Sequence, residues 1–367
     1  MLSAALNAVG HISMGRSYNP VLNCVHLAVA DGCLSVTASD GSTTATTKLA
    51  IPGAADDGEV IVSGRELIGI VSGLPDNRGD VAITVGTEAE ILCGTSRYNL
   101  PIVNSSFPVL TADESPTCAE LAIEPDLFRE SINRALEFVS DGQGTHYTEG
   151  VHFEVGDGLL TVVTTNGFCL GVNELPAECI ESDNPALLPG YAAKLLAKTL
   201  AACSQSISMR LSDGSIRITG GNTSMQLPLL ALKFPDWRRV IPTEFSGYID
   251  VDPKALLATM KRVLTMCDLV KYQERSHRHI IITGEGKLIV LSNYTTKRGF
   301  AADGVPCSIN GFDKPPRIML DPDALLKIIN CLGCETIRIS ISSTGSSILI
   351  TNPVSISARY VIQLIKE

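Results

Sequence analysis

The sequence is poor in aromatic residues and has no apolar run long enough to cross a membrane. Aromatic side chains make up 5% of its 367 residues, with a single tryptophan, Trp237. Because 45% of the residues are hydrophobic all the same, the cores must be built mainly from Leu, Ile, Val and Ala. A bilayer span needs about 20 consecutive apolar residues, and the N-terminus lacks the basic region and apolar core of a signal peptide. The sequence predicts a soluble, cytoplasmic protein.

Motifs for metal binding, disulfide frameworks and phosphate binding are missing as well. The 11 cysteines are odd in number and lie in apolar contexts, which is typical of small buried side chains in a reducing compartment. The one close pair, Cys331 and Cys334, has no second pair with which to form a zinc site. No Gly-x-x-x-x-Gly-Lys-Ser/Thr loop occurs in the sequence. We therefore expect no metal and no cofactor.

An enzymatic role finds little support. The best candidate for a cysteine hydrolase is Cys169, which has His146 and His152 near it in the sequence. A nucleophilic thiol also needs a base that a third group orients, and a site for the oxyanion. The sequence offers neither the orienting carboxylate nor the oxyanion site, so we expect a protein that is not an enzyme.

One phrase occurs three times in the sequence. It runs from Asp31 to Gly41, returns 126 residues later from Asp157 to Gly167, and returns after a further 128 residues from Glu285 to Asn293. Each copy follows an apolar run, so strand, Asp-Gly or Glu-Gly turn and strand predict a β-hairpin. Hairpins of this kind can recur by chance in a β-rich chain, but three at near-constant spacing indicate a duplicated module.

Predicted helices repeat at the same phase as the hairpins. Apolar residues at helical spacing mark the first helix of each module, at residues 2–9, 128–139 and 256–267. A second helix is predicted at residues 65–71, 191–203 and 322–332, the last with Asp321 as N-cap and Pro322 at its first position. We therefore predict an α+β fold of three repeated domains, each with two helices packed on antiparallel sheets, over residues 1–112, 113–242 and 243–367.

Charge is distributed unevenly between helices and loops. The formal net charge of −10 argues against a simple nucleic-acid binder, which is usually basic. The predicted helices at 191–203 and 253–267 nevertheless contain lysine and arginine and no acid. Basic side chains near phosphates supply sequence-independent, salt-sensitive attraction to DNA. Ordinary solvated helix faces would look the same, so the charge pattern alone leaves both interpretations open.

Several phrases together resemble the beta sliding clamp family of bacterial DNA polymerase III. The most specific is Lys233–Pro242, and others are Ser63–Leu67 and Ser96–Pro101. The resemblance covers essentially the whole chain, at the level of a divergent member. It implies a DNA-clamp fold in which three domains form half of a ring, and a head-to-tail homodimer that encircles double-stranded DNA without sequence preference. It also implies a processivity factor in DNA replication that tethers the polymerase, the clamp loader and other clamp-motif proteins.

The resemblance further implies three sets of site residues. The partner-peptide cleft maps onto Thr148, Thr165, Gly167, Phe168, Cys169, Leu170, Pro235, Arg239, Val240, Val361, Ile362, Gln363, Leu364 and Ile365. The DNA contacts map onto Arg16, Arg65, Gln143 and His146, with inner-helix candidates Lys194, Lys198, Lys254, Lys261 and Arg262. The dimer interface maps onto Tyr98 and Leu100 on one side and onto Met266 and Cys267 on the other.

The sequence departs from the family pattern in three places. Phe168 and Cys169 stand where the family usually has His-Arg, and the chain ends Gln363–Glu367 where the family usually has a Met-Pro-Met-Arg-Leu type of tail. Both changes fall in the cleft and predict a difference either in the preference for partners or in the sensitivity to inhibitors that bind the cleft. The family also opens with one more strand before the first helix, whereas this sequence starts at that helix, so either an upstream start was missed or the first domain lacks an edge strand. A second interpretation therefore stays open: a specialised phage-borne, resistance-type or second-copy clamp, or a pseudo-clamp that binds partners without encircling DNA.

Overall fold

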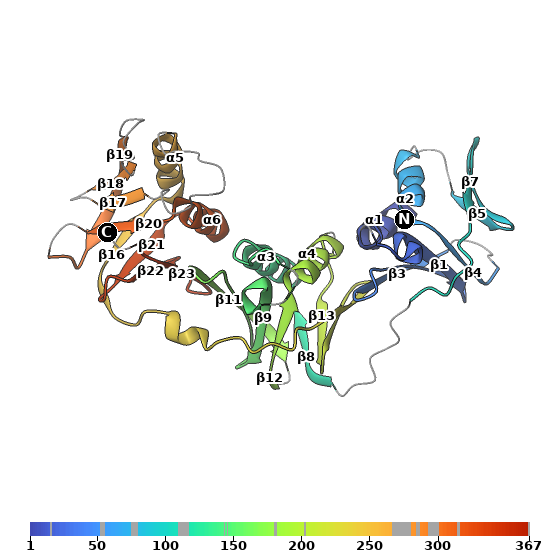
Figure 1. Ribbon diagram of the computed structural model, residues 1–367, viewed down its shortest axis with the longest axis horizontal. Coiled ribbons are helices and arrows are strands. Elements are labelled where there is room, and N and C mark those ends of the chain that lie inside the picture. Colours follow the sequence, from blue (N-terminus) through green and yellow to red (C-terminus); the bar gives the residue numbers. More distant parts are fainter. Residues whose placement is uncertain are drawn as a thin grey trace. The chain divides into compact units, whose positions relative to one another are not determined.

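The chain folds into two compact units. Figure 1 labels the helices and strands that they contain. The first comprises residues 1–133, 153–160 and 176–232, and the second comprises residues 134–152, 161–175 and 233–367. The computed structural model describes residues 1–14, 17–51, 56–74, 80–108, 117–142, 144, 146–179, 182–201, 203–265, 280–283, 287–292, 301–313 and 316–365. The division of the sequence into three domains stays a prediction.

Helices and strands follow one another in the same order three times. The first set is α1 (Leu2–Val9), β1 (Cys24–Ala30), β2 (Cys33–Ser39), β3 (Thr44–Ala50), β4 (Gly58–Ser63), α2 (Gly64–Gly73), β5 (Ala82–Val85), β6 (Glu88–Cys93) and β7 (Ser96–Pro101). The second set begins with β8 (Thr117–Ile123) and continues with α3 (Pro125–Leu136), β9 (Gly150–Gly156), β10 (Leu159–Thr165), β11 (Cys169–Cys179), β12 (Ser182–Pro189), α4 (Gly190–Thr199), β13 (Ile207–Ser212), β14 (Ser215–Gly220) and β15 (Thr223–Pro228).

The third set has the same order as the second. It contains β16 (Phe245–Val251), α5 (Pro253–Leu264), β17 (Ile280–Thr283), β18 (Lys287–Ser292), β19 (Ala302–Asn310), β20 (Arg317–Leu320), α6 (Pro322–Leu332), β21 (Ile337–Ser342), β22 (Ser347–Thr351) and β23 (Ala358–Gln363). Short 3-10 helices η1 (Gly10–Ile12), η2 (Pro20–Asn23), η3 (Tyr147–Glu149) and η4 (Trp237–Val240) lie between these elements. Among the described helices, none is both long and apolar enough to cross a membrane.

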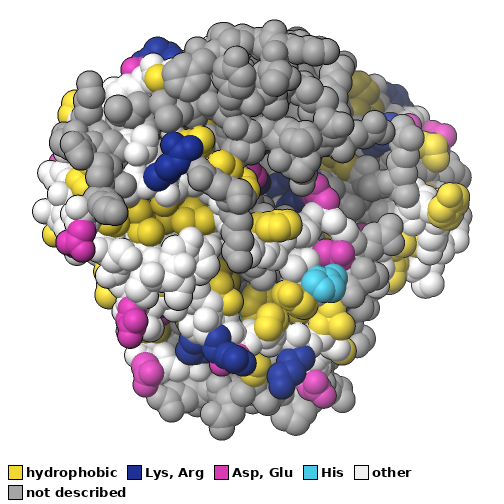
Figure 2. Space-filling model, turned by 60° about the vertical axis from the view of Figure 1, so that its left-hand side comes forward, with side chains coloured by type: hydrophobic (Ala, Val, Ile, Leu, Met, Phe, Trp, Pro, Cys, Tyr) yellow, Lys and Arg dark blue, Asp and Glu magenta, His cyan; other side chains and the backbone are white. Residues whose placement is uncertain are grey.

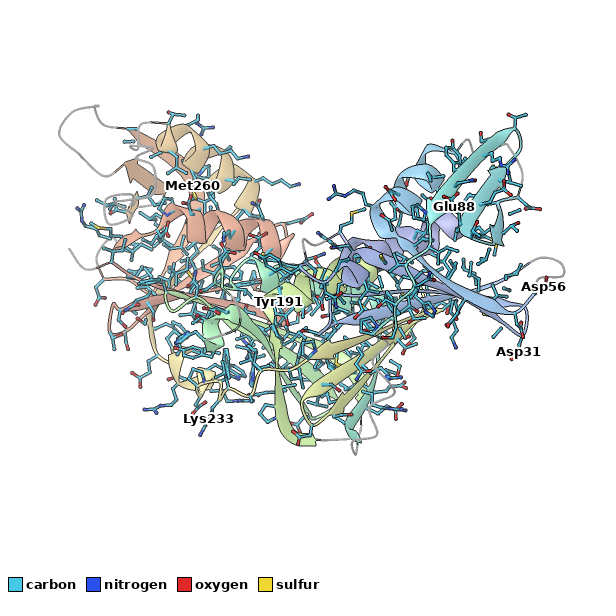
Figure 3. All side chains as sticks on the ribbon, turned by 45° about the vertical axis from the view of Figure 1, so that its right-hand side comes forward. Asp31, Asp56, Glu88, Tyr191, Lys233 and Met260 are labelled. Carbon is cyan, nitrogen blue, oxygen red and sulfur yellow. The ribbon has the colours of Figure 1, made fainter. Side chains whose placement is uncertain are left out.

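The hairpin turns have the backbone conformation that the repeated phrase predicts. Asp31 and Gly32 have φ of 51° and 73°, and Asp157 and Gly158 have φ of 54° and 70°. Two consecutive positive φ values define a type I′ turn, whose twist matches that of paired strands. Asp31 accordingly lies at the tip of a hairpin (Figure 3), and Ala30 pairs with Cys33 across it. The third turn, at Glu285-Gly286, lies outside the described residues.

Two of the predicted helices are shorter than their apolar periodicity. The predicted helix at 128–139 ends at Leu136 and the one at 191–203 ends at Thr199. After each end the chain continues in tight turns, because Phe138 N donates to Ala135 O and Cys203 N donates to Leu200 O, each three residues back. Such i→i+3 bonds satisfy the carbonyls that a helix end leaves open, while the apolar side chains stay on the same face. The end of the predicted helix 256–267 lies outside the described residues.

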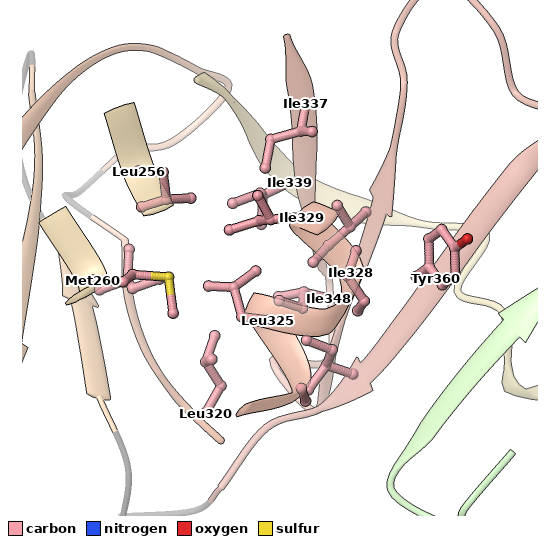
Figure 4. Packing of buried hydrophobic residues seen from close by; sticks show 14 of the residues in the cluster. Leu256, Met260, Leu320, Leu325, Ile328, Ile329, Ile337, Ile339, Ile348 and Tyr360 are labelled. Carbon is pink, nitrogen blue, oxygen red and sulfur yellow. The ribbon is translucent and has the colours of Figure 1, made fainter. Parts of the chain in front are cut away.

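The core of the second unit lies between helices α5 and α6 and the strands beneath them (Figure 4). Leu256 and Met260 come from α5, Leu325 and Ile328 from α6, and all four are fully buried. Alternate residues of β21, such as Ile337 and Ile339, meet them from the sheet. Burying an aliphatic side chain of this size contributes about 1.5–3 kcal/mol. Asp252 and Asp321 cap the two helices through their side chains, and a proline occupies the first turn of each.

One kind of strand junction occurs in each unit. In the first unit β3 pairs with β15, with Thr47 opposite Thr223. In the second unit β11 pairs with β23, with Asn173 opposite Ala358. In both cases the third strand after the first helix of one set pairs antiparallel with the last strand of the next set. The repeat in the sequence therefore reappears as a repeated way of joining consecutive sets.

Candidate functional site

Residues predicted to bind partner peptides come from four segments of the second unit. These segments are η3, the turn between β10 and β11, the stretch around η4, and β23 with the residues after it. The β11–β23 pairing places Cys169 opposite Ile362 and Leu170 opposite Val361. The backbone N–H of Gln363 donates to the carbonyl of Phe168 at 2.9 Å. The turn and the C-terminal strand are thus held together by main-chain hydrogen bonds.

The turn between β10 and β11 presents Phe168 to solvent. The Asn166 Oδ1 atom accepts from the backbone N–H groups of Phe168 at 3.0 Å and Cys169 at 2.8 Å. The Thr165 hydroxyl donates to the carbonyl of Cys169 at 2.7 Å and accepts from Gly167 N at 3.1 Å. Gly167 has φ of 89°, which favours glycine. These bonds fix the backbone, so Phe168 stands 74% exposed while Cys169 beside it is 4% exposed.

A stack of rings holds Phe234 and Pro235 against η3 and β9. The Phe234 ring stacks on His152 at 4.4 Å between centroids and meets Tyr147 edge-on at 5.7 Å. Tyr147 in turn lies 4.2 Å from the ring of His146, whose Nδ1 atom is 2.9 Å from the Thr148 hydroxyl oxygen. Edge-on and stacked ring pairs stabilise by about 0.5–1.5 kcal/mol beyond burial. The stack fixes the chain at both Thr148 and Pro235.

Members of the predicted cleft set differ in their access to solvent. Val240, which ends η4, is 53% exposed and Ile365 is 40% exposed, and Pro235 and Arg239 are exposed as well. In contrast Leu170, Val361 and Ile362 are at most 3% exposed, because their strands turn these side chains into the core. The buried members support the surface from within, and the exposed ones are available for contact. On the face shown in Figure 2, hydrophobic side chains reach the surface at several places.

Cys169 is not poised as a nucleophile. Burial, together with the nearby charge of Asp321, raises the pKa of its thiol to about 12. The thiolate is the reactive form of cysteine, so this side chain stays protonated at neutral pH. The ring of His146 is engaged with Thr148. The thiol of Cys169 therefore does not support the interpretation of the protein as a cysteine hydrolase.

Basic residues predicted to contact DNA lie on the exposed faces of three helices and before η3. Arg65 lies on α2, Lys194 and Lys198 on α4, and Lys254, Lys261 and Arg262 on α5, all exposed. The opposite faces of these helices are buried, through residues such as Leu196 and Met260. His146 precedes η3. Arg16 and Gln143 lie outside the described residues.

The charge of Arg262 is partly compensated within the second unit. Its Nε atom donates to the Asp303 Oδ2 atom on β19 at 2.5 Å, and its Nη2 atom donates to the Thr259 hydroxyl at 3.1 Å. The Arg262 guanidinium holds the pKa of Asp303 below its usual value. A guanidinium that already faces a carboxylate attracts phosphate less strongly than an uncompensated one. Arg262 is therefore a weaker candidate for DNA contact than its sequence suggests.

A contact that the sequence does not predict joins η1 to α4. The His11 Nε2 atom lies 3.2 Å from the carbonyl oxygen of Leu195 and 3.3 Å from the Thr199 hydroxyl. Burial, with a smaller contribution from the charge of Lys198, lowers the pKa of His11. Tyr191 lies on the same helix (Figure 3), and burial and the nearby Asp40 raise the pKa of its phenol. A single histidine in an apolar stretch gives no signal until the helix packed against it is known.

Strand edges carry the described half of the predicted dimer interface. Tyr98 and Leu100 lie on β7, where Tyr98 is 39% exposed and Leu100 is 5% exposed. Among the described strands, β7 pairs along its length with β6 alone, apart from a bridge between Ile102 and Val62 just beyond its end. The residues Met266 and Cys267 lie outside the described residues.

Comparison with known proteins identifies the family. The profile described as DNA polymerase III beta subunit, N-terminal domain, matches residues 1–111, and the profile of the central domain matches residues 122–236. The beta sliding clamp of Pseudomonas aeruginosa is 26% identical over 97% of this chain and 95% of that protein, and that of Vibrio cholerae is 23% identical over 96% and 94%.

Solved structures agree with the sequence comparison. The DNA polymerase III subunit beta from Pseudomonas aeruginosa has a TM-score of 0.89 and 25% identity, with coverage of 100% of this chain and 98% of that chain. The sliding clamp of the same organism bound to griselimycin has a TM-score of 0.90 and 25% identity, with coverage of 100% and 97%. The two family profiles together match more than half of the sequence, and the chain belongs to the DNA polymerase III beta subunit family, the beta sliding clamps.

Proposed function

We propose that this sliding clamp joins head to tail with a second copy of itself into a ring around double-stranded DNA. In the ring it acts in the cytoplasm without catalysis of its own, as a processivity factor that tethers a DNA polymerase, a clamp loader and other proteins with clamp-binding motifs. The observation that carries the proposal is the strand junction that occurs twice within one chain. By extension, two junctions of the same kind would join two copies of the chain, one at each end.

The open strand edges favour closure by a second copy. Two strands occupy junction positions without a junction partner among the described strands: β7, the last strand of the first set, and β19, the third strand after the first helix of the last set. A head-to-tail pair brings β7 of each copy to β19 of the other and leaves neither edge unpaired. Closed rings of this kind satisfy backbone groups that would otherwise invite aggregation.

Lysines on the helices supply the attraction to DNA in this proposal. Lys198 on α4 and Lys254 and Lys261 on α5 are exposed, and none of them has an ion pair among the contacts described. Phosphate contacts of this kind carry no sequence information, and they weaken as the salt concentration rises. A sparse set of such contacts holds the duplex within a ring and still lets the protein slide.

The exposed apolar residues of the second unit support the binding of short partner peptides. Phe168, Val240 and Ile365 expose large hydrophobic side chains, and Arg239 adds a charge nearby in sequence. Apolar surface of this kind on a folded protein commonly marks a site of protein contact. We assign the exposed members of the predicted set to direct contact with an apolar linear motif, and the buried members to support.

A topological experiment tests the ring. The purified protein is loaded onto nicked circular DNA with a clamp loader, and the bound fraction is followed by gel filtration before and after a restriction enzyme cuts the circle. We expect retention on the intact circle and rapid loss from the linear form, because only an encircling protein runs off at an end. Retention that does not depend on the circle would contradict encirclement and favour direct binding. No retention at all would favour a pseudo-clamp.

A further inference from the structure

The two internal junctions share one register, and this register can be extended to β19. Thr47 pairs with Val36, the sixth residue of the first repeated phrase, and Asp303 pairs with Val290, the sixth residue of the third. Asp303 therefore occupies in the third set the position of Thr47 in the first. The distance in sequence to the pairing with β16 leads to the same assignment. Asp303 lies four residues before Cys307, which pairs with the last residue of β16.

The same count holds in the second set. Asn173 lies four residues before Ala177, which pairs with Ile123, the last residue of β8. Thr47, Asn173 and Asp303 are thus equivalent positions. The first two are each 3% exposed and lie within a junction, whereas the Asp303 side chain is 32% exposed.

Positions on the last strands correspond in the same way. Thr223 is the first residue after the two-residue turn of its hairpin, and Ser96 is the first residue after the corresponding turn between β6 and β7. Ala358 corresponds to Thr223, because each lies opposite the equivalent residue of the third strand. Two residues further along each strand are Met225, Tyr360 and Tyr98.

These three residues differ sharply in exposure. Met225 is 1% exposed and Tyr360 is fully buried, yet Tyr98 is 39% exposed. Each of the two buried side chains lies opposite a small residue in its junction, Ala45 for Met225 and Gly171 for Tyr360. A Cβ atom at Gly171 would lie 3.3 Å from the Tyr360 ring, so the ring packs directly on that backbone. The residue that the register places opposite Tyr98 is Ala301, which is also small.

Tyr360 shows what a tyrosine does at this position. Its hydroxyl donates to the Asn173 Oδ1 atom at 3.2 Å, across the junction. At the equivalent position in the third set stands Asp303, whose carboxylate accepts from Arg262 Nε and, through Oδ1, from Gly304 N at 2.8 Å. A carboxylate has about four acceptor sites, which leaves capacity for a further donor. A hydroxyl bonded to a charged carboxylate makes a stronger hydrogen bond than one bonded to a neutral amide.

We propose that β7 of a second copy adds to β19 with Ser96 opposite Asp303, and that the Tyr98 hydroxyl then donates to the Asp303 carboxylate. The Tyr98 ring covers Ala301 as the Tyr360 ring covers Gly171. The occupant of the β19 edge is therefore a second copy of this chain, in one defined register. This inference rests on the proposed head-to-tail assembly and adds the residues that select the register.

Sedimentation of the Tyr98→Phe variant tests the hydrogen bond. Loss of the hydroxyl removes a hydrogen bond to a charged group, so the dimer dissociation constant should rise roughly 10- to 100-fold per interface. Tyr98 is exposed in the single chain, so its hydroxyl is not needed for folding. The matched control is Tyr18→Phe, because Tyr18 is fully exposed. An unchanged dissociation constant for Tyr98→Phe would refute the bond.

Substitutions at Asp303 distinguish a hydrogen bond between Tyr98 and Asp303 from an unspecific effect of the Asp303 charge. Asp303→Asn recreates the acceptor that Asn173 supplies in the internal junction, so dimers should persist and should still be weakened by Tyr98→Phe. Asp303→Ala removes the acceptor, so adding Tyr98→Phe to it should cause little further loss. Circular dichroism of each variant checks that the chain is folded. Equal, additive losses in both backgrounds would show that the two residues do not interact.

Cross-linking tests the register independently of affinity. Directly opposed residues of an antiparallel pair have Cβ atoms about 4.5–5.5 Å apart, close enough for a disulfide after a small adjustment. The double variant Ser96→Cys with Asp303→Cys should form a covalent dimer under mild oxidation. The control, Ser96→Cys with Gly304→Cys, places the second thiol on the other face of β19 and should form much less. Preferential cross-linking of the control would overturn the register.

The outcomes distinguish this inference from the proposed function. A wild-type protein that sediments as a monomer at all concentrations contradicts both. A wild-type dimer that loads onto circular DNA but is indifferent to Tyr98→Phe, and does not cross-link through residues 96 and 303, contradicts the register and leaves the clamp function standing.

Discussion

The two internal junctions share a register and differ in chemistry. In the first unit, β3 meets β15 through a pair of threonines, whose hydroxyl oxygens lie 2.8 Å apart between Thr47 and Thr223. In the second unit, β11 meets β23 through Asn173 and Tyr360, and the Tyr360 ring also packs against Phe138 at 5.4 Å. The first junction is therefore small and hydroxyl-bonded, and the second is built around a large aromatic ring.

Helices at the two junctions show the same contrast. At the first, His11 approaches the carbonyl of Leu195, the sixth residue of α4. At the second, Lys327, the sixth residue of α6, donates from its Nζ atom to the carbonyl of Glu137 at 2.7 Å. Both contacts join a residue that follows the first helix of one set to the middle of the second helix of the next set, with unrelated side chains. The features that the two junctions share are the backbone pairing and a small residue, Ala45 or Gly171, opposite the large side chain of the partner strand. The polar side chains at the junctions differ.

The largest difference between the junctions should appear when their large side chains are truncated. Tyr360→Ala removes a fully buried ring and should destabilise the second unit by about 3–5 kcal/mol. Met225→Ala, its counterpart in the first unit, should cost less, about 2–4 kcal/mol, because the side chain is smaller and flexible. The urea midpoint of each variant, followed by circular dichroism, measures the order. A larger loss for Met225→Ala would contradict the contrast.

Removing one hydroxyl at the first junction should have a smaller effect. Thr47→Val keeps the shape of the side chain but leaves the Thr223 hydroxyl buried without its partner, at a cost of about 1–3 kcal/mol. The double variant Thr47→Val with Thr223→Val removes both hydroxyls and should lie close to wild type. Urea denaturation of the two single variants and the double variant measures the coupling.

The control for this cycle lies on the same strand. Thr46 bonds Thr37 at 3.0 Å in a half-buried pair, where water can replace a missing hydroxyl. Thr46→Val should therefore change stability by less than Thr47→Val. Additive losses in the Thr47 and Thr223 cycle would show that the buried hydroxyl pair is not the feature that separates this junction from the other.

Local features were predictable from the sequence and long-range ones were not. The α6 helix matches its prediction, because Asp321, Pro322 and the apolar spacing all act within a few residues. The Asp-Gly turns are equally local. Pairings such as Thr47 with Thr223 join residues 176 apart, and no local pattern specifies which strands meet.

The candidate site shows the same limit. The family resemblance predicted a set of residues for the partner surface, but not the burial of Leu170 and Val361, since alternation in a strand assigns a face only after its neighbours are known. The ion pair between Arg262 and Asp303 could likewise not be predicted from the sequence, because the two residues are 41 positions apart and lie on different elements. The contacts between elements far apart in the sequence are thus the ones that the structure adds.

Acidification should weaken the first junction selectively, with the smallest effect of the three. Burial lowers the pKa of His11 from 6.5, so the unfolded chain takes up the proton before the folded chain does, and stability falls as the pH drops below about 6.5. Hydrogen-exchange protection factors, which correct for the intrinsic effect of pH on exchange, should therefore fall at β15 more than at β23 between about pH 8 and about pH 5. His11→Gln keeps a donor for the carbonyl of Leu195 but does not titrate, so it should remove the difference. If the variant retains the full pH dependence at β15, another group is responsible and the contrast between the helix contacts of the two junctions has no bearing on acid stability.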